Sequence, residues 1–159
     1  MKNIENLNFP PAEIPQKVVN NKTYLYDIVR RKYVVSGPEE WVRQHLLHFL
    51  IFHKNYPKNL ISVEKGVKVL AQHRRYDIVV YNSNGVPCLL AECKSYKIAL
   101  NQKTFNQATL YNLNQKVPYL LITNGLQHFC CKIDFATKTF SYLQDIPEYS
   151  TLDASFLNK

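Results

Sequence analysis

One short segment limits the possible folds more than any other: an apolar run that ends in two charged residues. Residues 88–91 (CLLA) are apolar without alternation, which is typical of a central strand buried on both faces. Glu92 and Lys94 follow two residues apart, so both side chains leave the same face of the sheet. A charge at the end of a buried strand needs a partner or a chemical role. The segment therefore predicts a buried sheet with charged groups at the end of a central strand.

The preceding strand adds a second carboxylate. Asp77 begins an apolar stretch, residues 76–81 (YDIVVY), and a tight turn at residues 82–85 (NSNG) joins it to the strand over residues 86–93. Asp77 and Glu92 can therefore converge. Two carboxylates about 4 to 6 Å apart repel, which raises one pKa unless a cation lies between them, and such oxygen ligands suit Mg²⁺ or Mn²⁺.

Lys94 has a use beside such a metal, because it can orient a water molecule or help to remove its proton. The alternative is a structural ion pair of Lys94 with Glu92 or Asp77, because paired charges at strand ends are common.

The first helix has the clearest start. Ser36 is a candidate N-cap, Pro38 suits the first turn, and Glu39 completes a capping box. Apolar residues recur at helical spacing to about Lys54, and this pattern leaves Glu40 on a different side from the cap.

The other elements follow in a mixed order. Three prolines in the first 20 residues predict an extended arm over residues 1–22. Residues 23–35 predict a β-hairpin whose basic run, residues 30–32, either touches a phosphate or forms a solvated turn. Further strands are expected at residues 60–70, 76–81, 86–93, 117–123, 127–133 and 139–143, and a second helix at 103–115. We expect one domain over residues 23–146 and a C-terminal tail over 147–159.

Composition and charge limit the binding partners and the cellular compartment that we expect. The chain has 159 residues and a net charge of +8, which favours DNA or RNA as a partner, although a merely basic surface explains the charge equally well. The four cysteines have no CxxC spacing, so neither a zinc ribbon nor a disulfide framework is indicated. The chain has no signal-peptide core and no apolar run near the roughly 20 residues of a membrane helix. These features predict a cytoplasmic protein without a membrane association.

Asp77, fourteen intervening residues and then Glu92-Cys93-Lys94 resemble the D…ExK core of PD-(D/E)xK nucleases, with Tyr76 where the motif has proline. More of the chain is similar to the N-terminal nuclease domain of type I restriction enzyme motor (R) subunits. The similar segments are TYLYDIVRRKYVVSGPEEWVRQHLL, RRYDIVVYNSNGVPCLLAECKS, NQATLYN and LLITNG, within residues 23–130. The resemblance implies an α/β fold with a restriction-endonuclease-like core: a central mixed sheet of four to five strands flanked by helices in the order αβββαβ.

The resemblance also implies a site. A magnesium ion, for which manganese substitutes, would be bound by Asp77, Glu92 and the backbone carbonyl of Cys93. Glu40 would support a ligand or a second metal, with Glu39 as the alternative. Gln107 and Tyr111 match a Q-x-x-x-Y pattern near the active site or DNA, although a solvated amide and ordinary helix packing are the alternatives. The catalytic residues would then be Asp77, Glu92, Lys94, Glu40 and Gln107, with Tyr111 as a DNA contact. Position and charge, rather than the resemblance, add Arg74 and Arg75 before Asp77 and Lys97 and Lys103 after the core as candidate DNA contacts. A basic surface that serves solubility explains the arginine pair equally well.

The expected function is metal-dependent hydrolysis of DNA by an endonuclease, with DNA and subunits of a restriction-modification, defence or repair system as partners. A nuclease-like module that binds DNA or a protein without cutting is the alternative, and the sequence does not distinguish DNA from RNA. These residues contain no GxxxxGK[ST] loop, so ATP-driven translocation is not expected. A protein with one active site would cut both DNA strands only as a dimer or by binding the DNA twice.

Overall fold

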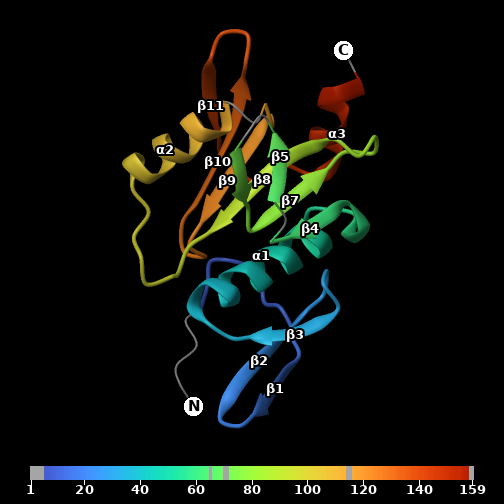
Figure 1. Ribbon diagram of the computed structural model, residues 1–159, viewed down its shortest axis with the longest axis vertical. Helices are drawn as coiled ribbons and strands as arrows, with labels where there is room; N and C mark the ends of the chain where they lie inside the picture. Colours follow the sequence, from blue (N-terminus) through green and yellow to red (C-terminus); the bar gives the residue numbers. More distant parts are fainter. Residues whose placement is uncertain (1–5, 65, 70–71, 114–115, 158–159) are drawn as a thin grey trace.

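A six-stranded mixed sheet forms the centre of the molecule (Figure 1). The computed structural model describes residues 6–64, 66–69, 72–113 and 116–157. The strands, in spatial order, are β11 (Thr139–Leu143), β10 (His128–Asp134), β9 (Tyr119–Thr123), β8 (Pro87–Cys93), β7 (Ile78–Tyr81) and β4 (Ile61–Val63). The pair β8–β9 is parallel and the other neighbours are antiparallel. The predicted mixed α/β class is confirmed, with six strands in place of the four or five expected.

Strand β8 lies between two hydrophobic clusters, as its unbroken apolar run predicts. Leu89 packs into the cluster that contains Leu46 and Leu50 of α1 (Pro38–His53). Leu90 packs into the cluster that contains Phe105 of α2 (Gln102–Leu113). Helix α2 provides the crossover that a parallel strand pair requires. Both faces of β8 are therefore covered, and its charged C-terminal end is where a polar site can form.

Helix α1 begins one residue later than predicted. Its N-cap is Gly37 in an extended conformation, Pro38 occupies the first turn, and no side chain caps the helix. Ser36 is not the cap because its N–H donates to the Thr23 carbonyl at 2.9 Å and so extends the pairing of the preceding strands. The predicted capping box with Glu39 is therefore wrong.

A small antiparallel sheet precedes α1. It consists of β1 (Gln16–Val19), β2 (Lys22–Asp27) and β3 (Lys32–Val35). The predicted hairpin over residues 23–35 is confirmed. The expectation of an arm without regular structure is wrong at β1, because Asn20 and Asn21 adopt positive φ angles of 49° and 60° and turn β1 back onto β2. Figure 1 shows α1 between this small sheet and the central sheet.

Other differences lie between α1 and β7 and at the C-terminus. After a 3₁₀ turn (Lys58–Leu60), the predicted strand over residues 60–70 is divided into β4 and β5 (Gly66–Val69) at Glu64, whose φ is positive at 54°. Strand β6 (Gln72–Arg75) pairs with β5 and was not predicted. The tail contains α3 (Tyr149–Leu157). Within the described ranges, no helix has the length and apolar character needed to span a membrane.

Candidate functional site

The predicted acidic residues lie at adjacent ends of β7 and β8. Ile78 is paired with Ala91 in this antiparallel ladder, Asp77 immediately precedes β7, and Glu92 follows Ala91 in β8, so the two acids lie at the same end of the strand pair. Their side chains are partly accessible, with 23% and 20% of their surface exposed. The sequence pattern therefore correctly predicts that the two carboxylates share one end of the sheet.

Asp77 is held by two donors from different elements. One guanidinium nitrogen of Arg43, on α1, donates to Oδ1 at 2.6 Å. The backbone N–H of Cys93 donates to Oδ2, also at 2.6 Å. The other terminal nitrogen of Arg43 donates to Glu40 at 2.7 Å. Arg43 therefore links α1 to the start of β7.

A second arginine extends this network toward the small N-terminal sheet. Arg30 donates to Asp27 at 2.7 Å, to Glu64 at 2.6 Å and to Glu40 at 3.1 Å. Asp27 is fully buried, and Gln44 Nε2 donates to it at 2.8 Å. The basic run predicted at the hairpin turn thus contributes Arg30 to the interior rather than to a solvated turn.

Glu92 and Lys94 form the ion pair that the sequence offers as an alternative to a metal site. Lys94 Nζ lies 2.5 Å from Glu92 Oε1. Partial burial lowers the pKa of Lys94, but the hydrogen bond and charge of Glu92, with Asp77 and Glu39 nearby, outweigh it and raise that pKa. Lys94 is therefore an ammonium at neutral pH, which suits orienting a water or binding a phosphate oxygen better than accepting a proton.

The two glutamates at the start of α1 have different surroundings. Glu40 is 14% exposed and contacts Arg30, Arg43 and Gln44. Glu39 is exposed, and its charge near Lys94 helps to raise the pKa of that lysine. Of the two, Glu40 is the one inside the network.

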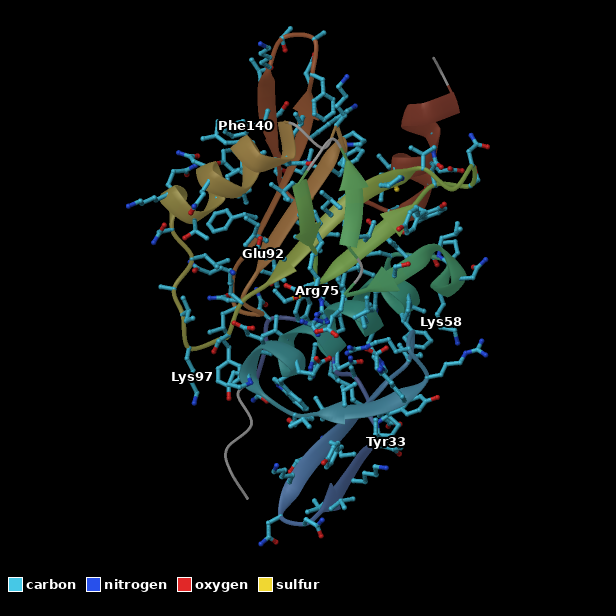
Figure 2. The ribbon with its side chains drawn as sticks, in the orientation of Figure 1. Tyr33, Lys58, Arg75, Glu92, Lys97 and Phe140 are labelled. Atoms are coloured by element: carbon cyan, nitrogen blue, oxygen red, sulfur yellow. The ribbon has the colours of Figure 1, made fainter. Side chains whose placement is uncertain are left out.

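The remaining predicted site residues are more scattered. Arg75 is 66% exposed and contacts Glu64 at 2.8 Å. Gln107 and Lys103 are exposed on α2, and neither belongs to the ion-pair network. Lys97 is exposed in the loop after β8, and Figure 2 shows it at the margin of the molecule, apart from Arg75 and Glu92. The side chains of Arg74 and Tyr111 lie outside the described residues.

The donor chemistry of the site fits a hard divalent cation, but the side chains do not form a ready cage. Among the described residues, no group of three His, Cys, Asp or Glu side chains is arranged to hold a metal ion. Mg²⁺ usually needs only one or two carboxylates and keeps several waters. Asp77, Glu92 and the carbonyl of Cys93 supply oxygen atoms of that kind.

Sequence reasoning missed the cations that hold these carboxylates. Arg43 lies three residues after Glu40, a spacing at which side chains on a helix meet, and this spacing was available in the sequence. Asp27, an isolated acid at the end of an apolar strand, was a similar indication. No sequence pattern marks Glu64 as a partner of the arginines, because its contacts depend on the bend between β4 and β5.

Comparison with known protein families shows to which family the chain belongs. The profile of the family "Type I restriction enzyme R protein N terminus (HSDR_N)" matches residues 38–147, more than half of the sequence. The chain belongs to this family. The matched region runs from α1 past β11 and contains Glu40, Arg43, Asp77, Glu92 and Lys94. The small N-terminal sheet, with Asp27 and Arg30, lies outside it.

A solved structure shares the fold of this R-protein N-terminal domain. It is a fragment described as an HsdR subunit of a type I restriction enzyme from Vibrio vulnificus YJ016, with a TM-score of 0.51 and 17% identity. The similarity covers 71% of this chain and 24% of that one, so the chain spans about a quarter of the length of that structure. A search of curated proteins found no match.

Proposed function

We propose that this chain is a metal-dependent nuclease domain with a restriction-endonuclease-like core that hydrolyses phosphodiester bonds in DNA. The observation that carries the proposal is the placement of Asp77 and Glu92 at the same end of the β7–β8 strand pair, with the Lys94 ammonium 2.5 Å from Glu92. Membership of the R-protein N-terminal family supports DNA as the substrate and a restriction system as the setting.

Each residue has a role in this proposal. Asp77, Glu92 and the Cys93 carbonyl would hold Mg²⁺, for which Mn²⁺ substitutes. When bound, the metal would act as a Lewis acid and lower the pKa of a bound water. Glu40 would act indirectly, through Arg43, which also contacts Asp77. A direct ligand role for Glu40 is not needed.

Lys94 supplies a fixed positive charge at the reacting phosphate. Its Nζ lies 2.5 Å from Glu92 Oε1, and from there the ammonium can donate to the attacking water or to a phosphate oxygen as negative charge develops. The exposed guanidinium of Arg75 is suited to contact an adjacent phosphate. Lys97 and Lys103 would contact DNA farther from the site.

A second candidate function is a nuclease-like module that binds DNA without cutting it. The observation in its favour is that Asp77 and Glu92 are each already paired with a cation of the same chain. Such pairing satisfies the carboxylates without a metal.

Nicking of supercoiled plasmid in the presence of Mg²⁺ or Mn²⁺ separates the two functions. We expect metal-dependent nicking by the wild type and its loss in Glu92→Gln and Lys94→Met. Glu148→Gln is a matched control, because this acid lies near Lys54, away from the proposed site, and should nick like the wild type. Full activity in both site variants would refute the assigned residues, whereas metal-independent DNA binding without nicking would support the second candidate.

A further inference from the structure

Both oxygens of Asp77 are already occupied within the chain. Arg43 binds Oδ1 and the Cys93 N–H binds Oδ2, each at 2.6 Å. The Arg43 side chain is only 7% exposed, so its charge is poorly screened by water. A divalent cation entering at Asp77 would therefore meet a buried guanidinium at the same carboxylate.

The balance of charges around Asp77 also opposes the entry of a divalent cation. Among the described residues, the network and the neighbouring Glu92–Lys94 pair contain five carboxylates and four cationic side chains: Asp27, Glu40, Glu64, Asp77 and Glu92 against Arg30, Arg43, Arg75 and Lys94. The chain's own cations thus neutralise most of the negative charge without a metal. Adding two positive charges at Asp77 makes the site cationic unless a cation moves or a phosphate enters.

Arg43 is the cation best placed to move. Its second terminal nitrogen contacts Glu40 at 2.7 Å and Glu64 at 3.4 Å, so its charge keeps two partners after it leaves Asp77. Asp77 itself remains fixed by the Cys93 N–H. The Nε atom of Arg43 is buried without a hydrogen-bond partner among the described residues, so the observed position leaves part of the guanidinium unsatisfied.

We propose that Arg43 is an internal counter-ion that competes with the metal for Asp77 Oδ1, so that metal binding and the Arg43–Asp77 ion pair exclude each other. The proposal rests on the proposed function, because it assumes that Asp77 is a metal ligand. It assigns Arg43 a positioning role: the residue keeps the acidic site folded before the metal arrives and sets the metal affinity.

A supporting role for Arg43 predicts the opposite change in metal affinity from a competing role. If Arg43 instead supported a metal-bound carboxylate by hydrogen bonding, its removal would weaken metal binding. If Arg43 competes with the metal, its removal strengthens metal binding. The direction of the change in affinity therefore distinguishes the two roles, and a merely structural arginine gives no gain.

Calorimetric titration of Mn²⁺ into the full chain provides the test. The matched variants are Arg43→Gln and Arg30→Gln, which remove the same charge from the same network, but only Arg43 contacts Asp77. We expect Arg43→Gln to bind Mn²⁺ about tenfold or more tightly than Arg30→Gln, because a charge-assisted hydrogen bond no longer opposes binding. Arg43→Lys, which keeps the charge without the planar fork, should bind with intermediate affinity and serves if the glutamine variant does not fold.

The outcomes separate this inference from the function on which it rests. If the wild type binds Mn²⁺ and the Arg43 variants bind it equally or more weakly than Arg30→Gln, Arg43 does not compete with the metal and only this inference fails. If no form binds Mn²⁺, the metal-dependent function fails and the inference falls with it. Tighter binding by Arg43→Gln, even where wild-type binding is too weak to measure, supports both.

Discussion

The two ends of the β7–β8 strand pair are built in contrasting ways. At the turn end, Asn82 Oδ1 accepts hydrogen bonds from the N–H groups of Asn84 and Val86 at 3.0 and 2.8 Å, and Gly85 adopts a φ of 76°. At the other end, Asp77 is held by Arg43, 34 positions away, and by the Cys93 N–H across the ladder.

This contrast separates a structural use of polar residues from a candidate functional one. Asn82 is buried, but its partners come from its own turn, so the segment satisfies itself. Asp77 depends on α1 and β8 for its partners, and buried ion pairs of this kind bring little net stability for the desolvation they cost. This charged end, assembled from several elements, is where we propose the functional site.

The largest expected effect is a loss of stability on replacing Asp27, a buried member of the ion-pair network at the charged end. Asp27→Ala removes a fully buried carboxylate and leaves Arg30 and Gln44 without one of their acceptors. We expect the free energy of unfolding, measured in urea, to fall by about 3 to 5 kcal/mol. A loss below about 1 kcal/mol would show that the network does not tie the small sheet to α1.

The next effect is on cleavage. Asp77→Asn keeps the shape of the side chain but removes its charge, so plasmid nicking should fall about 100-fold or more, because even residues that only support metal ligands contribute 10- to 100-fold. Asn82→Ala, at the other end of the same strands, should nick at the wild-type rate under conditions where it is folded. Equal losses in the two variants would remove the functional distinction between the ends.

A smaller effect on stability is expected at the turn. Asn82→Ala leaves two backbone N–H groups without their acceptor, so the free energy of unfolding should fall by about 1 to 2 kcal/mol. Mn²⁺ affinity should stay unchanged in a calorimetric titration. A weakened metal affinity would mean that the turn and the charged end are coupled along the strands.

The smallest effect is a pH dependence from Glu64. Partial burial raises the pKa of Glu64, but the charges of Arg43, Arg30 and Arg75 outweigh it, and the pKa lies below the ordinary value of 4.5. A lowered folded-state pKa stabilises the protein above the unfolded value and loses that contribution as the pH falls through the folded one.

Thermal unfolding of the wild type and Glu64→Gln from pH 7 to pH 3 measures this effect. The wild type should be the more stable protein at pH 7, and its advantage should shrink below about pH 4.5. An advantage that stays constant across this range would show that the Glu64 carboxylate is not stabilised by the arginines.

Much of the fold was predictable because its elements are specified locally. The apolar run at residues 88–91 predicts the central strand, and the NSNG turn predicts the β7–β8 hairpin. The strand β11 was predicted with its observed bounds. Strand β1 was missed because its pairing depends on the positive φ angles of Asn20 and Asn21, and β6 because its pairing depends on β5.

The candidate site was predictable only in its acidic part. The spacing of Asp77, Glu92 and Lys94 along two joined strands is a local pattern, and the register of β7 and β8 places both carboxylates at the same end of the strand pair. The Arg43 contact of Asp77 and the Arg30 contact of Glu40 were not predictable in this way, because they form only after the small sheet and α1 pack against the central sheet. Long-range ion pairs are set by packing rather than by sequence spacing.

Calorimetric titration of Mn²⁺ into the wild type and Glu92→Gln tests the central claim most directly. The account predicts saturable binding by the wild type and the loss of most of that affinity in Glu92→Gln, because the variant removes one of the two carboxylate ligands. No binding by the wild type, or equal binding by the two proteins, would contradict it and leave the Glu92–Lys94 contact as a structural ion pair.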